Sequence, residues 1–194
     1  DKIGAKWETF ANFWRTTQLE YTWLRSLMKR HKNFWDITED SLDKSMKVFN
    51  INKNMKSELL SLYKILSPYP EVRGVLEDLK KKNFKLAILS NGTPDLLNEL
   101  VENNKLNNLF DDLFSIEEVK IYKPDPSVYE LPVKKYKIKS GEITFLSANT
   151  WDVSGGGNFG YNSIWVNRNN SVFDILDFQP KNEINNLTHL LDKI

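Results

Sequence analysis

The stretch FKLAILSNGTP, residues 84–94, decides the fold of this chain. Its first seven residues are apolar apart from one lysine and the closing serine, which is typical of a strand covered on both faces of a parallel sheet. The Ser-Asn-Gly at the strand end permits a tight turn. Thr93 followed by Pro94 then predicts the N-cap and the first residue of a helix. The stretch therefore predicts a strand that passes directly into a helix.

The same alternation continues toward the C-terminus. Further apolar strands are predicted at 113–116, 143–147 and 163–167, with helices at 93–103 and 127–136 and a weak helix beginning at 155–160. Strands that alternate with helices of about ten residues indicate βαβ units. The predicted fold class is therefore α/β, with a Rossmann-like parallel sheet.

The N-terminal third has a different pattern. Apolar residues at helical spacing predict helices at 5–30, 38–50 and 55–66, the first with an unusually aromatic stripe. The connector Ser67-Pro68-Tyr69-Pro70 cannot continue a helix, because each proline removes an N–H and restricts the residue before it. We therefore expect a helical unit over 1–67 and an α/β unit over 68–194.

Composition limits the function classes. The 194 residues are 40% hydrophobic and 27% charged, which excludes collagen-like and wholly disordered chains. Lys plus Arg (27) nearly balances Asp plus Glu (26), so a nucleic-acid partner is not expected. There is no cysteine, which excludes a thiolate nucleophile and fits a reducing compartment such as the cytoplasm. No apolar run reaches the roughly 20 residues of a membrane helix, so a membrane partner is not expected either.

Polar residues stand where the predicted strands end, which is where open α/β sheets bind ligands. Ser90 and Asn91 follow the first strand, and the motif Ser147-Ala-Asn149-Thr-Trp-Asp152 follows the third. Lys123 is held between a tyrosine and a Pro-Asp-Pro segment, so its ammonium could neutralise charge at a catalytic carboxylate. Each cluster also has a plain structural reading, as a capped turn or a solvated loop lysine. The run of three glycines at 155–157 lacks the phosphate-loop pattern.

The order and spacing of these motifs resemble the haloacid dehalogenase (HAD) superfamily. Ser-Asn-Gly, Tyr-Lys-Pro-Asp-Pro-x-Val-Tyr and Ser-x-Asn-x-Trp-Asp carry the resemblance. Trp-Arg-x-x-Gln-Leu-Glu-Tyr-Thr-Trp-Leu-Arg, in the first predicted helix, narrows it to the type II L-2-haloacid dehalogenases. The resemblance implies a Rossmann-like core with a helical cap. It also implies that an Asp carboxylate displaces halide from an L-2-haloalkanoate, and that water hydrolyses the ester to a D-2-hydroxy acid, without metal or other cofactor.

The resemblance assigns roles to matching positions. The expected catalytic residues are Arg15, Ser90, Lys123, Ser147, Asn149 and Asp152. The expected substrate-binding and supporting residues are Asn91, Leu19, Phe34, Trp151 and Tyr129. Arg15 would receive the halide and Lys123 would pair with the nucleophile, while Ser147, Asn149 and Asp152 would position Lys123 and the hydrolytic water.

The remaining expected residues bind or support the substrate. Ser90 and Asn91 would hold the substrate carboxylate, and Tyr129 would support the site from behind. The apolar pocket would be lined by Leu19, Phe34 and Trp151. Without the resemblance, Phe34 and Trp151 are ordinary core aromatics and Arg15 is a surface arginine. His31 and His189 are expected to be surface histidines.

One expected element is missing. The family's first strand ends in a motif of the type Asp-x-Tyr-Gly-Thr-Leu, and nothing before Trp7 matches it. We therefore expect that the central strand, between the strands ending at Ser90 and Ser147, is absent from these residues, and that they are inactive alone. The alternatives are a Mg-dependent phosphatase of the same superfamily, or a non-catalytic fragment or pseudoenzyme. The long first helix, in a family that often dimerises this way, also predicts a homodimer.

Overall fold

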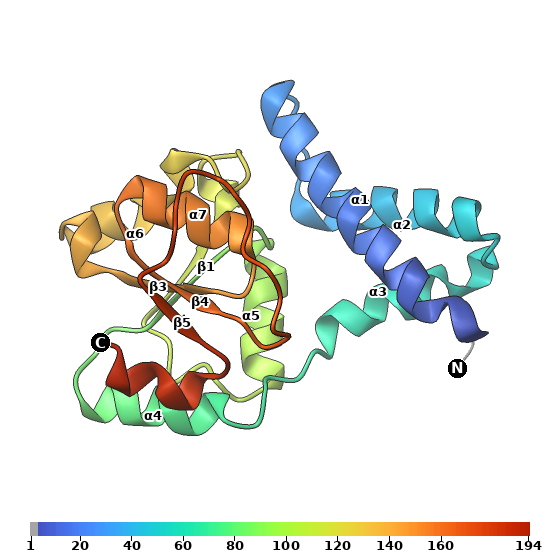
Figure 1. Cartoon of the computed structure of the whole chain (residues 1–194). Coiled ribbons are helices and arrows are strands. Elements are labelled where there is room, and N and C mark those ends of the chain that lie inside the picture. The colour runs from blue at the N-terminus through green and yellow to red at the C-terminus, as the bar shows by residue number, and fades with distance from the viewer. Residues whose placement is uncertain (1–3) are drawn as a thin grey trace.

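The computed structural model describes residues 4–194 as a helical lobe and a lobe of strands and helices (Figure 1). The helices are α1 (Trp7–Leu27), α2 (Phe34–Phe49), α3 (Lys56–Ser61), α4 (Val72–Lys81), α5 (Pro94–Asn103), α6 (Pro126–Tyr136) and α7 (Thr150–Phe159). The strands are β1 (Ala87–Ser90), β2 (Asp112–Ser115), β3 (Thr144–Ser147), β4 (Asn162–Val166) and β5 (Asn182–Ile184). Short 3₁₀ turns are η1 (Gly4–Lys6), η2 (Lys53–Met55), η3 (Leu62–Lys64), η4 (Ile116–Glu118), η5 (Ser140–Glu142) and η6 (Leu187–Asp192).

The helical lobe is built from α1, α2 and α3 around its own apolar cluster. The buried members of that cluster are Phe10, Trp14, Leu42, Met46 and Leu59. The helix α2 begins at Phe34, earlier than the predicted start at residue 38. Its N-cap is Asn33, whose side chain accepts from the Asp36 N–H at 2.9 Å. Thr38 is instead fully buried inside the helix, where its hydroxyl donates to the Phe34 carbonyl at 2.7 Å.

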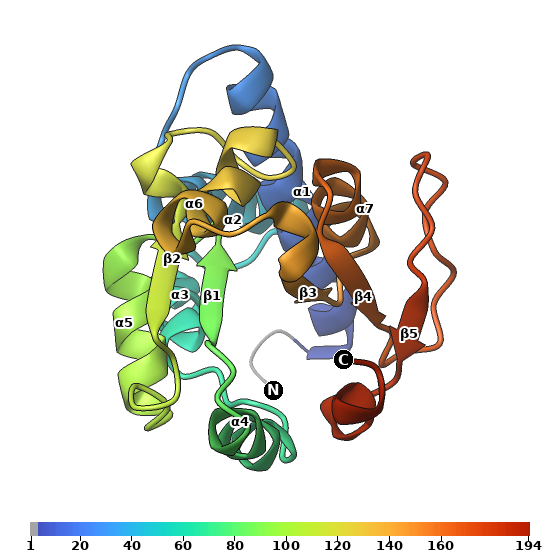
Figure 2. The same cartoon turned by 90° about the vertical axis from the view of Figure 1, so that its left-hand side faces the viewer.

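All described strand pairs are parallel, which confirms the predicted α/β class. The strands form two sheets, with orders β1-β2 and β3-β4-β5, and α5 packs on β2 while α7 packs on β3 and β4. Figure 2 shows β1 and β3 as the inner strands of the two sheets. Between them the described residues place no strand, and both inner strands are only partly buried, with Ala87 exposed. The short strand β5 had no sequence signal.

The three glycines of α7 act as packing positions. The helix begins at Thr150, earlier than predicted, and 155–157 lie inside it. A β-carbon on Gly156 would come within 2.7 Å of the Phe145 ring, and one on Gly157 would overlap the Phe178 ring. On Gly155 it would overlap the Tyr129 hydroxyl. Glycine here lets three aromatic side chains approach the helix backbone, and the run is not a phosphate loop.

The two lobes share a second apolar cluster. Phe34 and Ile37 of α2 pack there with four buried residues of the α/β lobe: Leu96, Ile116, Tyr122 and Val128. Tyr122 adds polar contacts, because its backbone N–H donates to the Ser26 hydroxyl at 3.1 Å and its phenol to the Lys32 carbonyl at 2.7 Å. The helical lobe is thus joined to the α/β lobe by buried side chains as well as by the connector.

Candidate active site

A buried ion pair lies at the end of the two inner strands. The Lys123 ammonium is 3.1 Å from Asp152 Oδ2, and the two residues are only 4% and 5% exposed. The ammonium also donates to the Leu89 carbonyl at 2.9 Å and lies 5.0 Å from the centre of the Phe145 ring. Burial lowers the pKa of Lys123, although the charge of Asp152 and the hydrogen bond to it oppose this shift.

Lys123 keeps one donor for a further group. An ammonium has three N–H bonds, and the described residues accept two of them, at Leu89 and Asp152. The third can face an anion arriving at the strand ends. A fixed, poorly hydrated ammonium stabilises such a charge more strongly than a solvated lysine would.

The carboxylate of Asp152 is held on both oxygens. Oδ2 faces Lys123, and Oδ1 accepts from the Tyr129 hydroxyl at 2.8 Å. Tyr129 is fully buried, and desolvation, with the nearby charge of Asp152, raises its pKa far above the usual 10.0, so the phenol keeps its proton and donates. Asp152 is therefore suited to positioning Lys123 and poorly suited to attacking a substrate itself.

The two strand-end motifs converge on this lysine. Asn91 Oδ1 accepts from the backbone N–H of Lys123 at 3.2 Å, and Ser90 Oγ accepts from the Gly92 N–H at 3.0 Å. In the same way Ser147 Oγ accepts from the Asn149 N–H at 3.2 Å. These bonds use oxygen lone pairs, so the hydroxyl protons and the Asn91 amide protons stay available to an anionic ligand.

The candidate residues of the helical lobe lie apart from the ion pair. Among the described contacts, none joins Arg15, Leu19 or Phe34 to Lys123 or Asp152. Leu19 is half-buried on α1, and Phe34 belongs to the shared apolar cluster, as its plain reading as a core aromatic predicts. Arg15 has an exposed surface, yet desolvation lowers the pKa of its guanidinium.

Trp151 links the helical lobe to the part of the molecule that holds the ion pair. Its ring meets the ring of Trp23 edge-on, with centres 5.6 Å apart and an interplanar angle of 82°. Since Trp23 is on α1 and Trp151 precedes Asp152 in α7, the helical lobe touches the helix that carries Asp152. The indole N–H of Trp23 is buried and has no partner among the described residues.

Several residues near Arg15 and near the junction of the lobes were not among the predicted site residues. Gln18 is fully buried and accepts from Arg15, and Tyr63 donates to the same amide oxygen. His31 is not a free surface histidine: its Nε2 lies 2.9 Å from Glu117 Oε2, which joins the α1–α2 loop to η4. The spacing of Gln18, three residues after Arg15 in a predicted helix, was the available signal.

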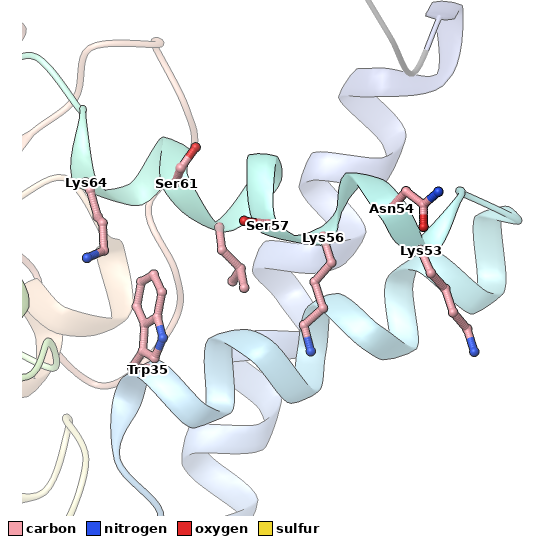
Figure 3. A pocket seen from close by; sticks show the side chains of 8 residues that line it. Trp35, Lys53, Asn54, Lys56, Ser57, Ser61 and Lys64 are labelled. Atoms are coloured by element: carbon pink, nitrogen blue, oxygen red, sulfur yellow. The ribbon is translucent and has the colours of Figure 1, made fainter.

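A separate hollow of about 500 Å³ opens on the helical lobe (Figure 3). It is lined by Trp35, Lys53, Asn54, Lys56, Ser57, Leu60, Ser61 and Lys64, none of which is a predicted site residue. Lys56 pairs with Asp43 at 3.0 Å, and Lys64 pairs with Glu99 at 2.9 Å. Two of the three lysines that line the hollow are thus each paired with an acid.

Two further features concern possible ligands and membranes. Within residues 4–194, no three side chains of the types His, Cys, Asp and Glu come close enough together to hold a metal ion. Within the same range, no helix is both long enough and apolar enough to cross a membrane.

Known proteins resemble this chain in both sequence and fold. Residues 8–166 match the family model described as haloacid dehalogenase-like hydrolase. The chain is 36% identical to (S)-2-haloacid dehalogenase 4A of Burkholderia cepacia, over 98% of this chain and 83% of the relative. A crystal structure of a dehalogenase superposes with a TM-score of 0.95 at 34% identity, over 98% of this chain and 85% of that one.

A second structure relates the fold to bound substrate. It is the L-2-haloacid dehalogenase of Xanthobacter autotrophicus with chloropropionic acid covalently bound. Its TM-score is 0.89 at 29% identity, over 96% of this chain and 86% of that chain. Similarity in sequence and in structure thus extends through both lobes, including the helical one. The chain belongs to the L-2-haloacid dehalogenases, within the HAD superfamily of hydrolases.

Proposed function

We propose that this chain provides the site for hydrolytic dehalogenation of (S)-2-haloalkanoates to D-2-hydroxy acids. The observation that carries the proposal is the buried Tyr129–Asp152–Lys123 chain, which holds an ammonium with a free N–H at the strand ends. Ser90 and Asn91, with their unused donors, fit the carboxylate of the substrate. The named relatives act on (S)-2-haloacids, which supports the same substrate class here.

The proposed reaction has two displacements. An Asp carboxylate oxygen forms a bond to C2 while the C2–halogen bond breaks. The bonding electrons leave with the halogen as halide, which Arg15 receives. Water, oriented by Asn149 and Ser147, then attacks the ester carbonyl carbon. The bond between that carbon and the oxygen on C2 breaks, which releases the hydroxy acid and restores the Asp carboxylate. Lys123 offsets the charge of the carboxylate in both steps. The products are the D-2-hydroxy acid, halide and a proton.

The attacking carboxylate is the part of this scheme that the described residues do not supply. Asp152 has both oxygens engaged, and it is the carboxylate that pairs with Lys123 within residues 4–194. We therefore propose that the 194 residues do not turn over alone, and that a strand ending in Asp-x-Tyr-Gly-Thr between β1 and β3 completes the site.

The two lobes are also assigned the roles of cap and core. The helical lobe, residues 1–67, acts as the cap, and 68–194 as the core; each has a buried cluster of its own, which supports the division. A homodimer in the cytoplasm is part of the same proposal. It rests on the exposed apolar side chains at the end of α1, such as Leu27 at 80%, and on the absence of cysteine. A monomer mass by light scattering would contradict the dimer.

Chloride release from (S)-2-chloropropionate in EDTA tests the function. The 194-residue chain is assayed beside the same chain fused to the N-terminal strand of the Burkholderia relative. We expect release only from the fusion, and none from its Lys123→Met variant. Release by the unfused chain would overturn the nucleophile proposal. Absence of release from the fusion, with Mg²⁺-dependent release of phosphate from a phosphomonoester, would favour the phosphatase alternative. No turnover of either kind would favour a non-catalytic role.

A further inference from the structure

Arg15 is braced by neutral groups. Its Nη1 donates to Gln18 Oε1 at 2.9 Å, and within residues 4–194 the structure describes no carboxylate paired with it. Gln18 is fully buried, although glutamine is usually exposed. The phenol of Tyr63 donates to the same Oε1, with oxygens 3.4 Å apart. The guanidinium is thus fixed without losing its charge to an acid.

The orientation of the Gln18 amide follows from the next bonds in the chain. Thr38 donates its hydroxyl proton to the Phe34 carbonyl at 2.7 Å, so its oxygen must act as an acceptor for Gln18. Gln18 Nε2 donates to that oxygen at 2.6 Å. The amide nitrogen therefore faces α2, and the amide oxygen has to face Arg15 and Tyr63. A buried chain of this kind permits one arrangement of donors and acceptors.

The protonation state of Tyr63 also fits this arrangement of hydrogen bonds. Desolvation raises the pKa of Tyr63, against the opposing effect of the Arg15 charge and of the Gln18 hydrogen bond. The phenol consequently stays protonated at neutral pH and remains a donor. Its ring also packs edge-on against Trp14, with centres 5.3 Å apart, which holds the hydroxyl in place.

We propose that Gln18 is a positioning residue that, held by Thr38, fixes the Arg15 guanidinium in one orientation while leaving its positive charge free for a halide. Gln18 does not touch the substrate. The fixing of Arg15 follows from contacts within the helical lobe, whereas the halide part rests on the proposed function. The residue must be glutamine, because glutamate at position 18 would hold Arg15 equally well but neutralise it.

Three variants of the 194-residue chain separate these roles. Gln18→Met removes all three side-chain hydrogen bonds of Gln18 at similar volume. Gln18→Glu keeps an acceptor for Arg15 and adds a charge, and Thr22→Ala is the control. Thr22 is a fully buried α1 hydroxyl that bonds only to the Leu19 carbonyl among the described contacts. Unfolding midpoints show that each variant is folded. If Gln18→Met does not fold, Thr38→Val, which removes the acceptor of the Gln18 amide, takes its place.

The first readout is the NMR order parameter of the Arg15 Nε–H bond. We expect a value near that of rigid backbone, about 0.85, in the parent, Gln18→Glu and Thr22→Ala chains, and below about 0.6 in Gln18→Met. Arg15 equally ordered in Gln18→Met, or already mobile in the parent, overturns the proposal.

The second readout is chloride binding, measured from the ³⁵Cl NMR line width. We expect Gln18→Met and Gln18→Glu each to weaken binding about tenfold, with Thr22→Ala unchanged, because a hydrogen bond to a charged group contributes on that scale. Unaltered binding in Gln18→Glu overturns the second half of the proposal, that Gln18 preserves the charge. No chloride binding by the parent, with Arg15 rigid, instead rejects the halide role of Arg15 in the proposed function and leaves the bracing supported.

Discussion

The contact between α7 and Tyr129 predicts that alanine at two glycines has opposite effects on stability. Both glycines are helical, so Gly→Ala gains up to about 1 kcal/mol of helix propensity at either site. At Gly155 the new β-carbon would overlap the Tyr129 hydroxyl and lie 2.7 Å from Pro124 Cβ. At Gly74 in α4, nothing lies within 4 Å of it. Gly74→Ala is therefore the matched control.

At Gly155 the cost of overpacking outweighs the gain in helix propensity, so the free energy of unfolding should fall. Overpacking a rigid site costs about 1–3 kcal/mol, and displacing Tyr129 also weakens its 2.8 Å bond to Asp152, a charged acceptor worth about 1.5–3 kcal/mol. After the propensity gain, we expect Gly155→Ala to lose about 2 kcal/mol. For a chain of this length that lowers the thermal midpoint by about 4–8 °C. Gly74→Ala should raise it by about 2 °C.

The assay is thermal unfolding followed by far-ultraviolet circular dichroism for the parent and both variants. Gly155→Ala should also change the near-ultraviolet signal of the tyrosines, whereas Gly74→Ala should not. If Gly155→Ala raised the midpoint as Gly74→Ala does, the close packing of Tyr129 on α7 would be refuted.

Three further perturbations probe other contacts. Asp152→Asn should reduce the free energy of unfolding in urea by about 3 kcal/mol, because it leaves Lys123 buried without its counter-ion; an unchanged urea midpoint would contradict this. Desolvation would raise the pKa of Glu71, but its hydrogen bonds, including that from Arg168, outweigh it and hold the pKa below the usual 4.5. The ionised carboxylate therefore stabilises the fold above pH 4.5, and this contribution is lost as the pH falls through the lowered pKa. As the pH falls, the free energy of unfolding should therefore drop more steeply for the parent than for Glu71→Gln. Equal slopes would count against the ion pair between Glu71 and Arg168. Phe34→Ala should cost about 3–5 kcal/mol, measured in urea, because it empties part of the cluster that both lobes share; a loss below about 1 kcal/mol would show that the lobes hold without it.

Local signals predicted most of the α/β lobe. The Thr93 cap with Pro94 placed α5 correctly, since capping is decided within one turn. A proline inside a helix usually kinks or ends it, yet α6 runs to Tyr136, as the predicted helix over 127–136 does, with Pro132 buried inside it. The strand β5 was missed because its three residues are too few to show a period.

The site was predictable where it depends on strand ends and less so elsewhere. Lys123, Tyr129 and Asp152 were identified from their motifs and are in direct contact. The contacts that hold Arg15 within the helical lobe could not be predicted, because packing between helices leaves no local pattern. Gln18 illustrates this limit, since its role depends on a bond to Thr38 twenty residues away.

The stereochemistry of the product tests the central claim most directly. The chain completed with the relative's N-terminal strand is incubated with racemic 2-chloropropionate in EDTA, and the lactate is resolved by chiral chromatography. Attack of a carboxylate at C2 inverts that carbon, and ester hydrolysis at the enzyme's carbonyl leaves it untouched. We predict D-lactate only, with half of the substrate remaining as the (R) enantiomer. L-lactate or a racemic product would contradict dehalogenation by this site.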